Sequence, residues 1–253
     1  MFFFTYKGNN METKVISLTS KNLTKNMEIV VYGHYGCAII LFPTFSDDEL
    51  ENEREGLLDS IAQYIKNGKC KVYSIPAVNF ESWLSPDLPP EEKSKRHYEY
   101  DKFVSDEVVP FIYQDCGGPV PIFTAGAAIG AYHSANSYFK RPDLFLGVIA
   151  MSGTYNIMHF SQGYFDENCY FNSPIHYLPN LMDNYWLSFL KSRHHVYIAS
   201  GTGDGEFPEN SSHLGEILSF KGIPHQIDLW GAEWGHNFDT WKAMLAHFIG
   251  TKI

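Results

Sequence analysis

The chain has 253 residues, of which 44% are hydrophobic and 16% aromatic. This composition supports one large hydrophobic core and excludes an intrinsically disordered chain. The formal net charge of −10 argues against a nucleic-acid partner, which would require a clustered basic face. No apolar run reaches the ~18 residues of a membrane span, and the first residues lack the pattern of a signal peptide. The sequence therefore predicts a cytoplasmic protein without a membrane partner.

The four cysteines (Cys37, Cys70, Cys116 and Cys169) are widely spaced and form no C-x-x-C pair. This spacing predicts free thiols in a reducing compartment rather than disulfides or a metal site. We expect neither a metal nor a cofactor.

In chain order, apolar runs alternate with amphipathic segments. Residues 13–19 and 27–33 predict the two strands of an edge hairpin. Residues 37–42 form a continuous apolar run, which is typical of a central strand buried on both faces. Ser46 and Glu49 form a capping-box pattern, which predicts a helix that ends at Asn67-Gly68 and has Leu57, Leu58, Ile61 and Ile65 among its apolar positions at helical spacing. A strand at 71–77 and a second helix at about 92–114 come next. If Met11 is a second start, residues 1–10 form a disordered extension.

Four more predicted strands lie at 120–124, 146–151, 195–200 and 225–230, with helices between most of them. Such an alternation predicts βαβ units and a mostly parallel sheet covered by helices on both faces, within a single α/β domain spanning the chain. Residues 153–190 interrupt it with many aromatic side chains, and we expect a cap or lid over the strand ends there.

A glycine-framed turn follows the predicted strand at 120–124. Its residues are Gly126-x-Ala128-x-Gly130, ahead of a predicted helix. The frame matches the nucleophile elbow of α/β-hydrolases, G-x-S-x-G, in which a sharp turn exposes the serine at the end of a strand. Ala128 occupies the nucleophile position.

In that fold, nucleophile, acid and histidine follow each other in this order. After Ala128, Asp204 lies on the loop that closes a late strand, and His236 lies on the loop after the last strand. His236 would act as general base, while Asp204 would hold its tautomer. Taken alone, Asp204 has a simpler explanation in turn chemistry, and Glu206 is a rival acid that the sequence does not exclude. The fixed order of the three positions favours the functional interpretation.

An oxyanion hole requires two backbone N–H donors. The first would be the N–H of Ile129, directly after the nucleophile position. The second must come from Thr44 or Phe45, because Pro43 between them and the preceding strand has no N–H.

Three aromatic residues are predicted to line a substrate pocket, namely Trp83, Trp234 and Tyr155. His133, one turn beyond the elbow, is expected to be a packed histidine. Ser152 is a serine close to the elbow in the chain but stands in no G-x-S-x-G frame.

Residues 124–136 (T-A-G-A-A-I-G-A-Y-H-S-A-N) resemble the elbow of an esterase family that includes esterase D (S-formylglutathione hydrolase), feruloyl esterases and enterochelin esterases. Phe42-Pro43-Thr44 and Trp234-Gly235-His236 are similar to that family's segments at corresponding places. The resemblance covers most of the chain. It implies the α/β-hydrolase fold and a serine carboxylic-ester hydrolase that works through an acyl-enzyme without metal or cofactor. The departure is Ala128, where the family has serine.

A methyl group can neither attack a carbonyl nor give a proton to His236, so the chain as written should be nearly inactive on esters. Either serine was replaced by alanine at 128 by design, or the chain is a natural pseudo-hydrolase that serves as a binding or scaffold protein. A third reading is an acyltransferase on the same fold. Intact Asp204, His236 and the strained turn favour the first. The expected partner is a small-molecule ester; the oligomeric state, including a homo-oligomer, stays open.

Overall fold

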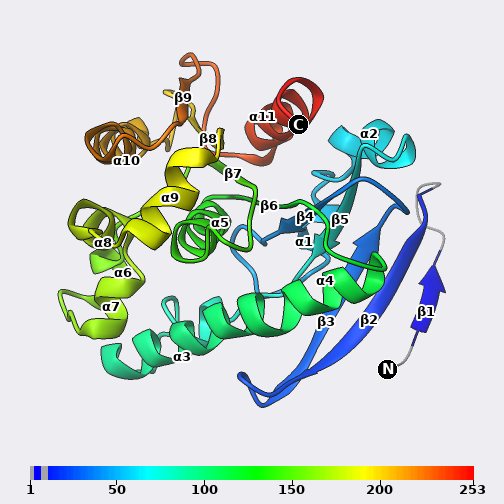
Figure 1. Cartoon of the computed structure of the whole chain (residues 1–253), viewed down its shortest axis with the longest axis horizontal. Helices are drawn as coiled ribbons and strands as arrows, with labels where there is room; N and C mark the ends of the chain where they lie inside the picture. Colours follow the sequence, from blue (N-terminus) through cyan, green and yellow to red (C-terminus); the bar gives the residue numbers. More distant parts are fainter. Residues whose placement is uncertain (1–2, 7–10) are drawn as a thin grey trace.

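The computed structural model describes the backbone of residues 3–6 and all of residues 11–253. Within these residues, nine strands form one sheet in the order β1-β2-β3-β5-β4-β6-β7-β8-β9 (Figure 1). The strands are β1 (Phe3–Tyr6), β2 (Thr13–Ser20), β3 (Lys25–Tyr32), β4 (Cys37–Leu41), β5 (Cys70–Ser74), β6 (Ile122–Ala127), β7 (Gly147–Met151), β8 (His195–Ser200) and β9 (Gln226–Leu229).

The sheet is parallel from β5 through β9 and antiparallel from β1 to β5. The predicted hairpin is confirmed as β2 and β3. The sheet continues beyond it, because Phe3–Tyr6 pairs with β2 as strand β1. That pairing departs from the expected disordered extension at 1–10, of which residues 1–2 and 7–10 lie outside the described residues.

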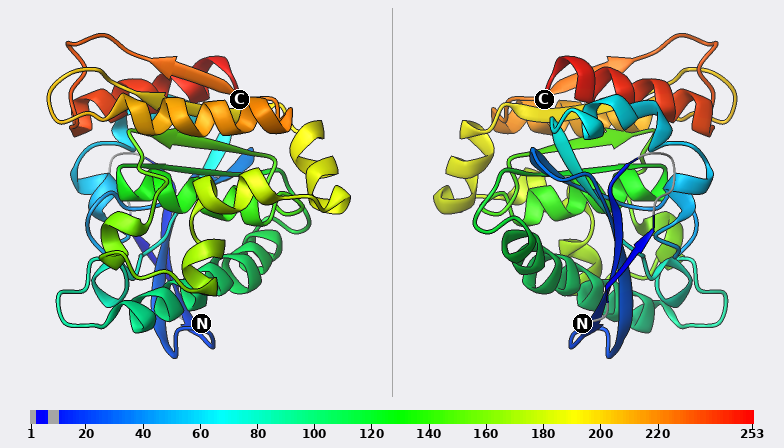
Figure 2. Two further views of the ribbon diagram at one scale, coloured as in Figure 1. Left: turned by 90° about the vertical axis from the view of Figure 1, so that its left-hand side faces the viewer. Right: turned by 90° about the vertical axis from the view of Figure 1, so that its right-hand side faces the viewer.

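The helices are α1 (Glu51–Arg54), η1 (Asp59–Ile61), α2 (Ala62–Lys66), η2 (Asn79–Glu81), α3 (Pro90–Phe103), η3 (Val104–Val108), α4 (Val109–Asp115), α5 (Ile129–Lys140), α6 (Met158–Ser161), α7 (Glu167–Phe171), α8 (Pro174–Asn180), α9 (Asn184–Ser192), α10 (Pro208–Lys221) and α11 (Phe238–Thr251). They lie on both faces of the sheet, as Figures 1 and 2 show. Among the described residues, no helix combines the length and apolar character needed to cross a bilayer.

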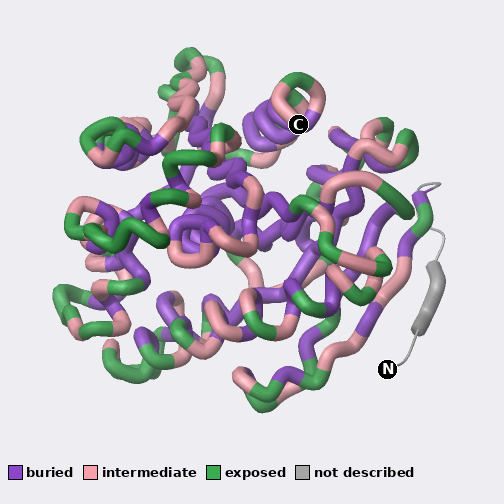
Figure 3. The backbone as a smooth tube through the Cα atoms, viewed as in Figure 1, coloured by how far each residue is buried: buried purple, intermediate pink, exposed green. Residues whose placement is uncertain are grey.

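Most of the core of the described residues lies in two apolar layers, one on each face of the sheet, and a smaller cluster surrounds Trp83. Side chains of β4 alternate between them: Ala38 and Ile40 pack into the layer under α3, α4, α5, α8 and α10, while Ile39 and Leu41 pack into the layer under α2 and α11. Figure 3 shows this burial concentrated in the central strands and in α5. The α/β class, with a mostly parallel sheet between helical layers, is confirmed.

The aromatic-rich segment 153–190 forms the short helices α6, α7 and α8 and the first part of α9, between β7 and β8. α7 packs against α3, and α8 packs against α5 and α10. Figure 1 shows these helices on the α5 side of the sheet. That these helices act as a lid remains a prediction. Residues of α6 border the cavity described below.

Candidate active site

The turn between β6 and α5 has the backbone of a nucleophile elbow. Ala128 adopts φ 52° and ψ −119°, a region that residues with a side chain rarely occupy. Its N–H donates to the carbonyl of Met151 on β7 at 3.0 Å, which holds the turn against the neighbouring strand. The conformation therefore persists with a methyl side chain at its apex.

Both glycines of the frame are required by close backbone contacts. A Cβ at Gly126 would lie 2.4 Å from the carbonyl oxygen of Gly130, and a Cβ at Gly130 would lie 2.6 Å from that of Pro43. These distances are far below van der Waals contact, so only glycine lets α5 start so close to β6 and to the loop after β4. The G-x-x-x-G frame predicted from the sequence is a steric requirement of this turn.

Of the predicted oxyanion donors, Ile129 and Phe45 border the cavity described below, and Thr44 does not. Ile129 is the first residue of α5, so its N–H has no acceptor within the helix. The carboxylate of Glu51 accepts the N–H of Thr44 at 2.5 Å, that of Ser46 at 3.2 Å and that of Phe45 at 3.3 and 3.4 Å. The assignment of Thr44 is therefore corrected: it is fully buried and its N–H is bound internally. Phe45 has the weaker of these bonds.

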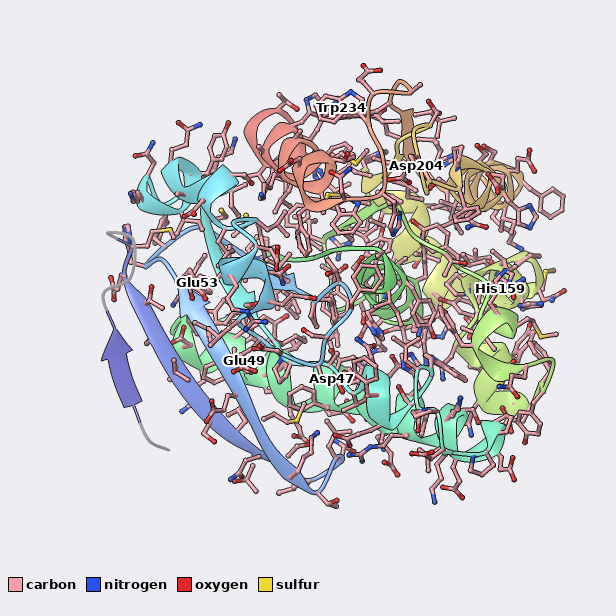
Figure 4. The ribbon with its side chains drawn as sticks, turned by 180° about the vertical axis from the view of Figure 1, so that it is seen from behind. Asp47, Glu49, Glu53, His159, Asp204 and Trp234 are labelled. Carbon is pink, nitrogen blue, oxygen red and sulfur yellow. The ribbon has the colours of Figure 1, made fainter. Side chains whose placement is uncertain are left out.

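The carboxylate beside His236 is that of Glu206. His236 Nδ1 lies 3.6 Å from Glu206 Oε1, and the Glu206 side chain is 1% exposed. Asp204 is an exposed residue, labelled in Figure 4 on the loop after β8, and it meets His236 through its backbone carbonyl, which accepts the His236 N–H at 2.9 Å. The prediction of Asp204 as the acid is therefore wrong. Gly205, with φ +73°, turns the chain so that the carboxylate after it points inward.

Two serine hydroxyls fix the carboxylate of Glu206. Ser152 Oγ donates to Oε1 at 2.6 Å, and Ser200 Oγ donates to Oε2 at 2.8 Å. Burial would raise the pKa of Glu206, but these hydroxyls and the neighbouring His236 outweigh it and hold the pKa below its usual value. Glu206 is therefore a carboxylate at neutral pH and can stabilise a positive charge on the imidazole of His236.

Ser152 is a residue of this site whose role the sequence did not reveal. It follows β7 with φ 52°, and its Oγ accepts the indole N–H of Trp241 at 3.0 Å. The same oxygen of Glu206 faces both Ser152 and His236, and Ser152 is nearer, at 2.6 Å against 3.6 Å. The signal available in the sequence was its position directly after the predicted strand 146–151, which neighbours the strand that precedes Glu206.

A cavity of about 690 Å³ joins these elements. Ala128, Ile129, Ser152 and His236 border it on the side of the sheet. The rest of its wall is formed by Phe45, Leu84, Gly153, Thr154, His159, Phe160, Gly205, Phe207, Glu209 and Asn210. The alanine of the elbow and the predicted histidine thus open into one cavity, at the carboxyl ends of the parallel strands, where ligands bind in such sheets.

The three predicted pocket aromatics do not line this cavity, and their assignment is corrected. Trp83 and Tyr155 are each 1% exposed and belong to the core. Trp234, labelled in Figure 4, packs its ring on that of Trp230, with centroids 4.8 Å apart. The wall is instead built by neighbours such as Leu84, which the sequence pattern does not distinguish from core residues.

Behind the elbow, two buried histidines form a structural network, as expected for His133. His133 Nε2 bonds to Asn79 Oδ1 at 2.7 Å, and His97 Nε2 bonds to the hydroxyl of Tyr132 at 3.0 Å. The two imidazole rings stack with centroids 5.3 Å apart. Burial lowers the pKa of both well below the ordinary value; Lys140 adds to this at His97 and the paired ring adds to it at His133.

These histidines predict acid sensitivity of the fold. Because their folded pKa is depressed, the unfolded chain binds more protons below about pH 6.5, and stability present above that pH falls as the pH drops. We expect the free energy of unfolding in urea to fall between about pH 7.5 and 5.5, and His97→Gln to reduce this slope. His213→Gln is the control, because the His213 side chain is 57% exposed. Equal slopes in the two variants would contradict the prediction.

In sequence, neither a protein-family model nor a curated protein matches the chain. Solved structures of low identity share its fold. A ferulic acid esterase covers 94% of the chain and 96% of its own, with TM-score 0.72 and 17% identity. An S-formylglutathione hydrolase from Agrobacterium tumefaciens covers 99% and 98%, with TM-score 0.73 and 12% identity. A ferulic acid esterase from Anaeromyces mucronatus covers 98% and 93%, with TM-score 0.67 and 15% identity. The chain has the α/β-hydrolase fold.

Proposed function

We propose that the chain is an esterase-type α/β-hydrolase with a Ser-Glu-His arrangement whose serine position holds Ala128, so that it binds small esters without hydrolysing them. The observation that carries the proposal is the opening of Ala128 and His236 into one cavity, with the carboxylate of Glu206 buried behind the imidazole. In an active arrangement, His236 would take the proton of the nucleophile and Glu206 would stabilise the imidazolium. Ile129 would supply an oxyanion donor at the start of α5.

Replacement of a serine by alanine at position 128 accounts for the retained geometry. A strained residue at φ 52° costs on the order of 1–3 kcal/mol, and that cost has a use when the residue presents a nucleophile. The buried carboxylate of Glu206 likewise suits an imidazole that becomes charged during a reaction. Fold relatives that are esterases add support to this class of activity.

The second candidate is a binding protein whose site neither catalyses a reaction now nor did so before. One observation favours it. The N–H groups of Thr44 and Phe45 both donate to Glu51, so the second oxyanion donor is engaged within the protein. A hydrolase needs that donor free at the moment of reaction.

Ala128→Ser tests the proposal. We expect hydrolysis of p-nitrophenyl acetate to rise about 10³-fold or more over the Ala128 chain, because the nucleophile completes the arrangement. Ala128→Gly is the matched control, since it also lacks a hydroxyl and should stay inactive. Product transfer to an added alcohol would identify an acyltransferase. A folded Ala128→Ser chain that is inert on acetyl to octanoyl esters would leave the binding protein as the better account.

A further inference from the structure

We propose that the cavity binds free monocarboxylic acids with an apolar body in preference to their esters, the carboxylate lying between the N–H of Ile129 and the imidazole of His236. This deepens the proposed function and rests on it, because it names the ligand class of the same cavity. The inference uses three features of the site: the methyl of Ala128, the charges around the carboxylate position and the lining of the cavity.

The first feature is the size of the side chain at the elbow. Ala128 borders the cavity with a methyl group, where an active relative of this arrangement would place a hydroxyl oxygen facing the histidine. One of the two equivalent oxygens of a carboxylate can take that oxygen's place while the other meets Ile129 N–H. An ester has one good acceptor oxygen and carries an alkyl group on the other, so it satisfies only one of these positions.

The second feature is the charge that surrounds this position. Ile129 begins a helix of 12 residues, whose N-terminal N–H groups and dipole favour an anion. His236 turns Nδ1 toward Glu206, which leaves Nε2 on the side of the cavity. In a protonated ring, Nδ1 faces the carboxylate of Glu206 at 3.6 Å and Nε2–H donates to the ligand, so that carboxylate, imidazolium and carboxylate alternate in charge.

Two further titratable groups border the cavity. Glu209 lies in the first turn of α10 and His159 on α6, and both are exposed. Figure 4 labels His159 on its helix, apart from the loop that carries Asp204. The carboxylate of Glu209 disfavours a second negative charge on the ligand, which selects monocarboxylates over dicarboxylates. The hydroxyl of Ser152 is already committed to Glu206 and Trp241.

The third feature is an apolar lining able to hold the body of such an acid. Phe45, Leu84, Phe160 and Phe207 supply most of it. The rings of Phe45 and Phe207 are 51% and 61% exposed, so a ligand that covers them removes apolar surface from water. The volume of about 690 Å³ is in the range of small-molecule sites and accommodates an aryl or short alkyl group.

Calorimetric titration with phenylacetate, methyl phenylacetate and phenylacetamide tests the inference. We expect phenylacetate to bind about tenfold or more tightly than either methyl phenylacetate or the amide, because only the acid offers two equivalent acceptor oxygens. His236→Gln should abolish the preference, whereas His159→Gln, at the other wall of the cavity, should retain it. Ala128→Ser should weaken phenylacetate binding about tenfold, because its hydroxyl occupies the second oxygen's place.

Equal affinities for the acid and its ester or amide, a preference that survives His236→Gln, or no binding of any of the three would overturn the inference. Its failure is separable from failure of the proposed function. If Ala128→Ser hydrolyses esters while the Ala128 chain shows no preference for the acid, the function stands and the ligand assignment falls. If the acid preference is found while Ala128→Ser is inert, the ligand assignment stands without the esterase.

Discussion

In a chain that carries Ala128→Ser, Glu206→Gln is expected to lower kcat for p-nitrophenyl acetate about 10⁴-fold, whereas Asp204→Asn leaves kcat within about twofold. The glutamine amide keeps the size of the side chain but replaces one acceptor oxygen with a donor. The ring of His236 is then offered an N–H donor in place of a carboxylate and loses the stabilisation of its charged form. Asp204 contacts the histidine only through its backbone carbonyl, which the amide leaves unchanged.

The expected change lies in kcat rather than in KM, because Glu206 is buried behind His236 and does not border the cavity. Steady-state kinetics over a range of ester concentrations separates the two constants. A loss of activity in Asp204→Asn comparable to that in Glu206→Gln would restore Asp204 as the acid and contradict the geometry.

Trp241→Ala is expected to destabilise the protein by about 3–5 kcal/mol, a large share of the total stability of a domain. Trp241 is 1% exposed on α11, and its ring packs edge-on against His236, with centroids 5.0 Å apart. Its indole N–H also donates to Ser152 Oγ. Removing the ring leaves a cavity in the layer between α11 and the sheet. It also removes the aromatic ring against which the imidazole of His236 packs.

Trp241→Phe separates packing from hydrogen bonding. It keeps most of the aromatic surface and removes the donor to Ser152, so a cost of about 1 kcal/mol is expected. Urea unfolding monitored by circular dichroism measures both variants. A loss below about 1 kcal/mol in Trp241→Ala would show that the indole contributes little to the layer under α11.

The alternation of elements was predictable because buried parallel strands are continuous apolar runs, as at Cys37–Leu41. The helix expected at about 92–114 is confirmed as α3, η3 and α4 in succession. By contrast, the helix expected after Ser46 is divided into α1, η1 and α2, and Gly56, with φ +74°, lies at the break between α1 and η1. Apolar spacing predicted the buried face of that segment but not the glycine that interrupts it.

The site was predictable where a residue type is required by backbone geometry and unpredictable where side chains reach across loops. Gly126 and Gly130 mark the elbow because no other residue fits there. Whether Asp204 or Glu206 points inward depends on the φ of Gly205, which the sequence does not reveal. Ser152 likewise has its role only because β7 ends next to β8 in the sheet.

The carboxylate of Glu51 competes with any incoming anion for the backbone N–H groups of the loop after β4. It accepts three successive backbone N–H groups, from Thr44 to Ser46, and the short chain between donor and acceptor gives it a high effective concentration. A diffusing ligand therefore gains little from this loop unless Glu51 withdraws. Recognition of an oxyanion is thereby shifted toward the start of α5, where the N–H of Ile129 has no acceptor within the helix.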